Sequence, residues 1–234
     1  MHEPFITPTL PFRDERCTTL QLLENARMTI LETIAALDAL DLHIFLQVNG
    51  QPSAPHWLFV PAYFLATQLI YLLPVGLAGS WCWGTERERQ LVLHVLFAVL
   101  VLLLLNQAIG LAWPRPRPFM LGVGHTFFSH TPTPSFPSNH AGIVWTCGLV
   151  LASGIRSRVL GWLTLVAGAG VAWARVFLGV HFPLDMIGAM VTALLAWRLT
   201  AFVWPGLNGV LYGLCLRAYH SVFAYPIAWK WVRD

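Results

Sequence analysis

The chain has 234 residues, of which 56% are hydrophobic and only 11% are charged, and its formal net charge is +3. Soluble globular domains carry about 25% charged residues, so this composition leaves too little polar surface for a water-soluble particle. It excludes an ordinary soluble enzyme and predicts an integral membrane protein, and the weak positive charge does not indicate a nucleic-acid partner.

The N-terminal part divides into two segments. Residues 1–19 contain several prolines and charges but no apolar stretch like that of a signal peptide, and we expect a flexible tail. The segment 20–56 follows, and within it Leu20–Val48 mixes charged and apolar residues at nearly helical spacing. This pattern favours an amphipathic helix at the membrane interface over a sixth span. The helix serves either as a surface anchor or as a lid over bound lipid.

Five later stretches are candidates for membrane-spanning helices, because about 20 apolar helical residues cross a bilayer core. They are Trp57–Gly79, Leu91–Trp113, Ala141–Gly154, Val159–Val180 and Leu184–Trp204. The third is short, but it gains length if its helix begins near Ser138. Residues 206–234 form either a second interfacial segment or a poor final span. We therefore expect an all-α integral membrane protein, a bundle of about five to six transmembrane helices, with its core at 57–205.

Basic residues are unevenly distributed over the loops. With five spans, the loops at 81–90 and 155–158 and the C-terminal tail share one side, and they hold most of the basic residues after residue 57. The positive-inside rule places that side in the cytoplasm. The loop at 114–138 and the turn at 181–183 then face outward.

Three polar clusters interrupt the apolar pattern, and the expected topology brings all three to the outward face. They are Trp113–Phe119, Pro137–His140 and Ala174–Asp185. Arg117 and Arg175 are suited to donate paired hydrogen bonds to phosphate oxygens. Ser138 falls at the expected N-cap of a helix, where the first backbone N–H groups attract anions.

The third cluster also contains a candidate nucleophile. His181 and Asp185 are four residues apart, so on a helix they share a face. A carboxylate bound to one imidazole nitrogen fixes the tautomer and leaves the other nitrogen free to attack phosphorus. His140 is then the candidate general acid for the departing oxygen.

These residues, in this order and spacing, resemble the type-2 phosphatidic acid phosphatase superfamily, which includes bacterial lipid phosphatases and vanadium haloperoxidases. Its pattern is Lys-x6-Arg-Pro, then Pro-Ser-Gly-His, then Ser-Arg-x5-His-x3-Asp. The matches are Arg117-Pro118, Pro137-Ser138-Asn139-His140 and Arg175-x5-His181-x3-Asp185, and the resemblance covers about residues 57–205. It implies a His181 nucleophile, a His140 acid and a phosphohistidine intermediate, with no metal and no cofactor.

The chain departs from this family pattern at three positions. Gly110 stands where the family has lysine, and Arg115 is a candidate replacement for that cation. Asn139 replaces a glycine, which leaves its backbone N–H available for phosphate. Ala174 replaces a serine and removes one hydroxyl group.

Within the superfamily, the strings around Arg117, Gly124-His125-Thr126 and Ser138 look most like bacterial undecaprenyl-diphosphate phosphatases. This resemblance implies hydrolysis of undecaprenyl diphosphate to the monophosphate, which recycles the lipid carrier of cell-wall synthesis. It also implies a multi-pass protein of the bacterial cytoplasmic (inner) membrane with its active site facing the periplasm. His125, Thr126 and His130 are possible contacts of the diphosphate, with solvation of their loop as the equal alternative.

Other functions stay open at this point. A related lipid phosphatase or phosphotransferase would act on phosphatidylglycerophosphate, phosphatidic acid or lipid A, and a non-enzymatic flippase would use the Arg/His cluster only to bind headgroups. A haloperoxidase is disfavoured because those relatives are soluble. The four cysteines lack metal-binding spacing, so we expect ordinary thiols. The sequence leaves the oligomeric state and the physiological lipid open.

Overall fold

The computed structural model describes residues 15–234, and every regular element in that range is a helix. The chain divides into two compact units, one ending at Leu42 and the other beginning at His43. Helix α1 (Glu15–Val48) confirms the helix predicted at 20–48. The tail predicted at 1–19 lies, as far as residue 14, outside the described residues. The interfacial position of α1 stays a prediction.

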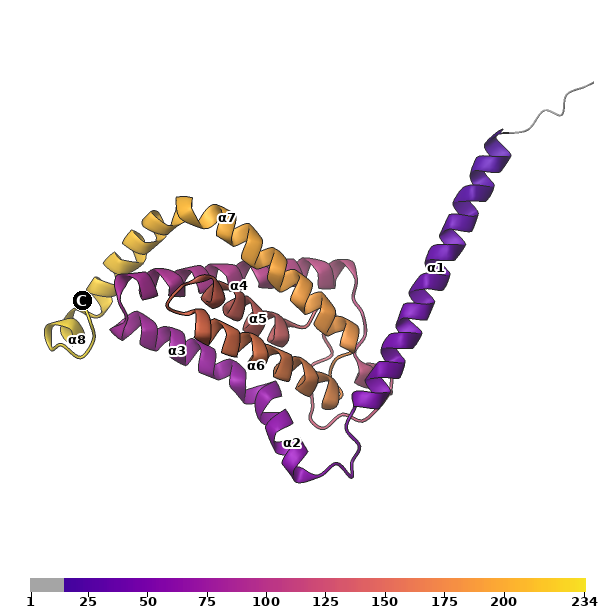
Figure 1. The fold of residues 1–234 in the computed structure, drawn as a ribbon, viewed down its shortest axis with the longest axis horizontal. Coiled ribbons are helices and arrows are strands. Elements are labelled where there is room, and N and C mark those ends of the chain that lie inside the picture. Colours follow the sequence, from indigo (N-terminus) through magenta and orange to yellow (C-terminus); the bar gives the residue numbers. More distant parts are fainter. Residues whose placement is uncertain (1–14) are drawn as a thin grey trace, which may run out of the picture. The chain divides into compact units, whose positions relative to one another are not determined.

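Residues 43–234 form a bundle of helices (Figure 1). Its first helices follow one another without a break: α2 (His56–Tyr63), a π-helical turn (Phe64–Gln68) and α3 (Leu69–Trp83). They are followed by α4 (Glu86–Ala112), a short 3₁₀ turn (Pro118–Met120), α5 (Asn139–Ser153), α6 (Arg158–Phe177), α7 (Pro183–Val222) and α8 (Ala224–Ala228).

Four helical stretches among the described residues are long and apolar enough to cross a membrane: His56–Trp83, Glu86–Ala112, Arg158–Phe177 and Pro183–Val222. They correspond to four of the five predicted spans and confirm an all-α, multi-pass membrane protein. The remaining prediction, Ala141–Gly154, corresponds to α5, whose 15 residues reach roughly 22 Å against a hydrocarbon core of about 30 Å. Because α5 packs against α4, α6 and α7, and eight of its 15 residues are buried, protein rather than lipid surrounds most of it.

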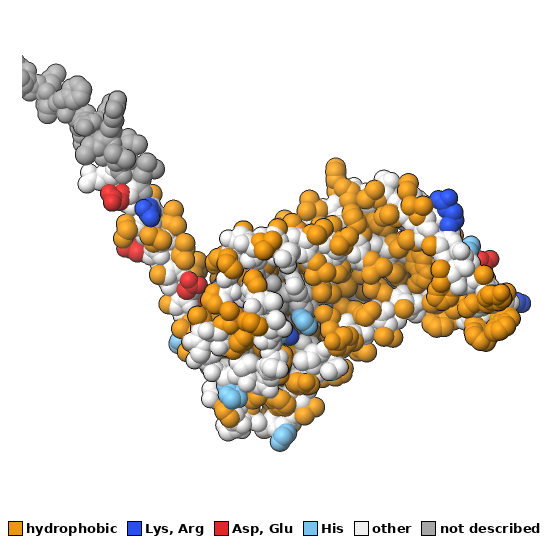
Figure 2. Space-filling view, turned by 180° about the vertical axis from the view of Figure 1, so that it is seen from behind, with side chains coloured by type: hydrophobic (Ala, Val, Ile, Leu, Met, Phe, Trp, Pro, Cys, Tyr) orange, Lys and Arg blue, Asp and Glu red, His pale blue; other side chains and the backbone are white. Residues whose placement is uncertain are grey.

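The outer surface of the bundle is apolar. Hydrophobic side chains cover most of the face shown in Figure 2, and Lys and Arg atoms are sparse on it. Large apolar residues such as Val75, Leu104, Val166 and Leu195 are exposed on α3, α4, α6 and α7. Such a surface is expected where lipid tails, rather than water, contact the helices.

Helices α5 and α6 approach each other closely because α6 carries glycine at the contact. A Cβ atom added at Gly161 would lie 2.2 Å from the backbone nitrogen of Ala152, and one at Gly168 would lie 2.4 Å from the indole of Trp145. Small residues at such positions allow the close packing typical of membrane helices. This contact fixes α5, which carries His140, against α6, which carries Arg175.

Helix α7 is longer than the span predicted at Leu184–Trp204. It continues through Pro205 to Val222, and Figure 1 shows that it bends along its length. A proline inside a helix removes one backbone hydrogen bond and clashes with the preceding turn, so it can kink a helix without ending it. The segment predicted at 206–234 therefore begins inside a bent helix, and its place at the interface or in the membrane stays a prediction.

The C-terminal residues pack against the turn between α3 and α4. The buried guanidinium of Arg89 donates to the carbonyl oxygens of Trp81 (2.9 Å) and Arg233 (2.6 Å) and lies 4.9 Å from the ring centre of Tyr219. The backbone N–H of Arg233 in turn donates to the carbonyl oxygen of Cys82 at 2.8 Å. Arg89 thus joins the end of α3, the start of α4 and the C-terminus.

The helix directions place the three predicted clusters together. Helices α4 and α6 end, and α5 and α7 begin, at the same end of the bundle. The segment after α4 carries Arg117, α5 begins with Asn139, and the α6–α7 turn carries His181. The alternation of helix direction that the sequence predicts therefore brings together three segments, of which the first and last are more than 60 residues apart in the chain.

Candidate active site

A cavity of about 340 Å³ lies at this end of the bundle. Five of the predicted site residues line it: Arg117, Asn139, His140, Arg175 and His181. The other lining residues are Asn106, Gln107, Gly110, Leu111, His130, Thr133, Pro134, Phe136 and Pro137. The cavity is therefore built from all three predicted clusters and from the last turns of α4.

The geometry around His181 defines its tautomer. Its Nδ1 lies 3.1 Å from Oδ2 of Asp185, and its Nε2 lies 3.0 Å from Nη1 of Arg117. An arginine can only donate, so Nε2 accepts and carries the lone pair, while Nδ1 carries the proton and donates to Asp185. Imidazole in this tautomer directs its nucleophilic nitrogen toward the cavity and the basic side chains.

His181 is also uncharged at neutral pH. Burial lowers the pKa of His181 to about 3, and the positive charges of Arg175 and Arg117 act in the same direction, against the hydrogen bond to Asp185. The turn that carries it requires Gly179, whose φ is +78°, because a Cβ there would lie 2.1 Å from the carbonyl oxygen of His125. The neutral ring is thus held on a tightly constrained turn.

Asp185, in the first turn of α7, is fully buried and accepts from several donors. Its Oδ2 accepts from the N–H of Phe182 at 2.8 Å and from the hydroxyl of Ser135, and its Oδ1 forms an ion pair with Nη1 of Arg115 at 2.9 Å. These contacts hold the carboxylate beside His181. The structure places Arg115 on Asp185, with its guanidinium 4.7 Å from the ring centre of Phe182, and not among the cavity-lining residues.

Two buried arginines face the cavity without a carboxylate partner among the described residues. Arg117 donates to the carbonyl oxygens of Thr133 (2.9 Å) and Val180 (3.0 Å), and burial lowers its pKa to about 10, so it stays charged at neutral pH. Arg175 donates to the carbonyl oxygen of Ala66 at 3.2 Å, and its Nε has no partner among the described residues. Buried charges are costly unless they are paired. An anion in the cavity would compensate both.

The start of α5 provides further donors. Ser138 is the N-cap residue and is fully buried, but its hydroxyl does not cap the helix and has no partner among the described residues. The first backbone N–H groups of a helix lack acceptors within it and form an anion site. The adjacent Pro137, Asn139 and His140 line the cavity, so we infer that these donors serve a phosphate there.

His140 belongs to two spaces at once. It lines the polar cavity, and it also lines an apolar groove of about 380 Å³ formed by residues of α3, α4 and α5. Leu73, Leu77, Leu96 and Ile143 are among the groove's apolar residues. A group that leaves the cavity through this groove would pass His140.

Two predicted substrate contacts are placed elsewhere. The backbone N–H of His125 donates to Oδ1 of Asn49 at 2.7 Å, and the hydroxyl of Thr126 donates to the carbonyl oxygen of Gly179 at 3.3 Å. Neither residue lines the cavity. These contacts hold the loop at 125–126 against the turn that carries His181.

His130, a possible contact of the diphosphate from the sequence, lines the cavity. Its Nε2 lies 3.1 Å from Nη2 of Arg175, and burial lowers the pKa of His130. Sequence reasoning missed two other residues of the site. Ser135 supports Asp185 from a loop. Asn106 is buried in α4 and donates to Oδ1 of Asn139 at 2.9 Å. Only Asn106 had a signal in the sequence, because a polar residue inside an apolar span usually has a function.

Comparisons with known proteins identify the family. Residues 91–208, about half of the chain, match the PAP2 superfamily. The chain is 34% identical over 198 residues to the Escherichia coli (strain K12) protein named "Putative undecaprenyl-diphosphatase YbjG", covering 85% of this chain and 100% of that protein. It is 28% identical over 137 residues to "Undecaprenyl-diphosphatase BcrC" of Bacillus subtilis (strain 168), covering 58% and 67% of the two chains.

A solved structure shares the fold. The crystal structure of the first transmembrane PAP2 type phosphatidylglycerolphosphate phosphatase from Bacillus subtilis superposes with a TM-score of 0.54. The sequence identity is 22%, and the match covers 71% of this chain and 85% of that chain. At this identity the likeness shows the transmembrane fold alone.

Proposed function

The chain belongs to the PAP2 superfamily of phosphatases, and on this premise we propose that it hydrolyses undecaprenyl diphosphate to undecaprenyl phosphate through a phosphohistidine at His181. The observation that carries the chemistry is the neutral imidazole of His181, whose Nε2 faces a cavity with two buried arginines. The choice of lipid is supported by the relatives named undecaprenyl-diphosphatase.

In the first step the terminal phosphate enters the cavity as an anion. Arg117 and Arg175 donate to its oxygens, together with the hydroxyl of Ser138 and the backbone N–H groups of Asn139 and His140. Arg117 donates to Nε2 of His181 in the structure, so phosphate binding transfers this donor from the imidazole to an oxygen and frees the lone pair. Donors fixed in advance around the phosphoryl group supply most of the catalysis in such reactions.

In the second step Nε2 of His181 attacks phosphorus in line with the bridging oxygen. The N–P bond forms as the P–O bond to the lipid monophosphate breaks, and the Nδ1 proton stays between the ring and Asp185. The carboxylate stabilises the positive charge that develops on the ring. The ion pair with Arg115 and the hydroxyl of Ser135 keep Asp185 in place.

The position of His140 matches a general acid for the leaving group. The leaving oxygen carries the lipid, and the apolar groove at His140 is a suitable path for a polyprenyl chain from the bilayer. His140 therefore stands between the phosphate and the chain, where it donates its proton to the departing oxygen. It then takes a proton from water, which attacks the phosphohistidine, releases inorganic phosphate and restores the lone pair on His181.

We further propose that the site faces the outside of a bacterial cytoplasmic membrane. The other end of the bundle carries Arg87, Arg89, Arg156 and Arg158 in the α5–α6 turn and the first turns of α4 and α6, and the positive-inside rule assigns this end to the cytoplasm. The α6–α7 turn and the segment between α4 and α5 then face the periplasm. Labelling of a single cysteine introduced at residue 122 with an impermeant reagent on intact cells tests this orientation, and protection there would contradict it.

Phosphate release tests the function. Purified protein in detergent with EDTA is assayed on undecaprenyl diphosphate, phosphatidic acid and phosphatidylglycerophosphate, and mass spectrometry identifies the lipid products. We expect release with EDTA present, a preference for the diphosphate, and loss in His181→Ala but not in the matched control His220→Ala, which lies outside the cavity. Full activity of His181→Ala would refute the mechanism, and release only from glycerolipids would move the substrate. Transfer of phosphate to a second lipid would identify a phosphotransferase.

A further inference from the structure

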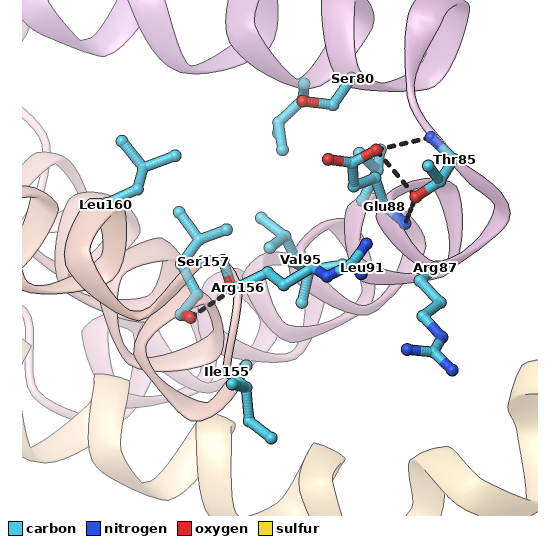
Figure 3. Close-up of a pocket in the computed structure, with 14 residues that line it drawn as sticks. Ser80, Thr85, Arg87, Glu88, Leu91, Val95, Ile155, Arg156, Ser157 and Leu160 are labelled. Carbon is cyan, nitrogen blue, oxygen red and sulfur yellow. Dashed lines mark hydrogen bonds between the residues drawn. The ribbon is translucent and has the colours of Figure 1, made fainter.

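A second cavity lies at the opposite end of the bundle from His181. It has a volume of about 410 Å³ and lies where the α3–α4 and α5–α6 turns come together (Figure 3). Along α4 the nearest lining residues of the two cavities are Val95 and Asn106, 11 residues or roughly 16 Å apart. The two cavities share no lining residue.

Two arginines give this second cavity a positive charge. Arg87 projects from the first turn of α4, and Arg156 extends from the α5–α6 turn across the cavity (Figure 3). Neither forms an ion pair with a carboxylate among residues 15–234. Glu88 is the one acidic residue in the lining. Its carboxylate accepts from the N–H (2.6 Å) and the hydroxyl (2.8 Å) of Thr85, and Arg156 lies near enough to attract it electrostatically. Two arginines against one carboxylate leave the lining with an excess of positive charge.

The cavity continues into an apolar groove between α3, α5 and α6. The groove has a volume of about 450 Å³, and four residues line both spaces: Leu77, Ser80, Leu151 and Leu160. Gly76 lines the groove, and a Cβ atom added there would meet nothing within 4 Å, so the space beside it is open. A positive pocket at the membrane surface that continues into an apolar groove matches the two parts of a phospholipid.

We propose that this composite site binds one anionic phospholipid of the surrounding bilayer. Arg87 and Arg156 hold its phosphate with charge-assisted hydrogen bonds, and an acyl chain lies in the groove beside Gly76. Basic pockets between transmembrane helices bind anionic headgroups in this way. The lipid fills the space between α3 and the α5–α6 pair and stabilises their association. The headgroup pocket shares no lining residue with the catalytic cavity, whereas the acyl groove and the groove at His140 share Leu73, Leu77 and Cys147.

Lipid binding to the full chain tests the proposal. Delipidated protein in detergent is titrated with dioleoylphosphatidylglycerol, dioleoylphosphatidylcholine or water-soluble glycerol 3-phosphate, and native mass spectrometry and thermal unfolding are followed. We expect one retained phosphatidylglycerol and a raised Tm, weaker retention of phosphatidylcholine, and no effect of glycerol 3-phosphate. His181→Ala retains the lipid, because the catalytic cavity is not involved. Equal retention of both lipids, or loss of retention in His181→Ala, would overturn the proposal.

Matched variants test each half of the site. Replacing Arg87 and Arg156 with glutamine weakens phosphatidylglycerol binding roughly 25-fold, about fivefold for each arginine. The same replacement at Arg198 and Arg217, which are exposed on α7 and do not line the cavity, leaves binding unchanged. Binding that is equally strong in both double variants would show that the arginines do not hold the headgroup.

A pair of glycines on α3 tests the groove. Gly76→Leu places a side chain in the groove and reduces lipid retention. Gly79→Leu is the control: a Cβ atom at Gly79 also meets nothing within 4 Å, but Gly79 lines neither the cavity nor the groove. Both changes raise helix propensity equally. Equal retention by the two variants would contradict an acyl chain beside Gly76.

Discussion

Replacing Asp185 with asparagine is the sharpest test of how His181 is activated. The carboxylate accepts from Arg115, Ser135, the N–H of Phe182 and Nδ1 of His181. An asparagine keeps the shape but has one acceptor oxygen, so its NH₂ group faces either Arg115 or the other three donors. The developing charge on His181 then loses a charge-assisted hydrogen bond, and the orientation of the ring is no longer fixed.

The expected size of this effect follows from the number and kind of lost contacts. A hydrogen bond to a charged group contributes about 1.5–3 kcal/mol, and leaving a buried donor unsatisfied costs about 1–3 kcal/mol. Together they raise the barrier by about 4 kcal/mol, which lowers kcat roughly 10³-fold. KM changes little, because Asp185 lies behind the imidazole and does not line the cavity.

Steady-state and single-turnover phosphate release on undecaprenyl diphosphate measure this split. Circular dichroism and the Tm of the variant show whether the bundle is intact. The reasoning would be refuted by a folded Asp185→Asn variant with wild-type kcat, or by one whose defect lies in KM alone.

Four further changes have defined outcomes. Ser138→Ala removes a buried hydroxyl beside the proposed phosphate site and reduces kcat/KM about tenfold. The Tm is not lowered, since the hydroxyl has no partner within residues 15–234. An unchanged kcat/KM would exclude the contact. Arg89→Ala leaves the carbonyl oxygens of Trp81 and Arg233 without their donor and destabilises the protein by about 2–4 kcal/mol in thermal unfolding. Loss of activity without a lower Tm would contradict a structural role for Arg89. Gly161→Leu forces α5 and α6 apart and abolishes folded protein, as judged by size-exclusion chromatography. The pKa of His181 is lowered in the folded state, so the unfolded chain takes up a proton first as pH falls. Stability is therefore lost below about pH 6.5, the ordinary pKa of histidine. The Tm of His181→Ala should decline less steeply from pH 7 to 4 than that of wild type.

The local motifs and the helix directions were predictable, because they depend on apolar length and on spacing along the chain. Alternating spans were enough to bring Arg117, His140 and His181 to one end of the bundle. Which side chains then pair was not predictable. Arg115 was expected at the phosphate, yet its partner is a carboxylate 70 residues away.

Other features depended on tertiary packing. The support that Ser135 gives to Asp185 comes from a loop whose path has no periodic signal. The short helix α5 is covered by its neighbours, so its length did not need to match the bilayer. Pro205 could end α7 or bend it, and sequence alone does not distinguish the two outcomes.

Direct detection of a phosphorylated enzyme tests the central claim. Undecaprenyl diphosphate labelled with ³²P in its terminal phosphate is mixed rapidly with the wild-type protein, and the reaction is quenched in alkali during the first turnover. The account predicts an acid-labile, alkali-stable label on His181 that is absent from His181→Ala. Phosphate release by wild type, with no label on His181 at any time after mixing, would contradict it.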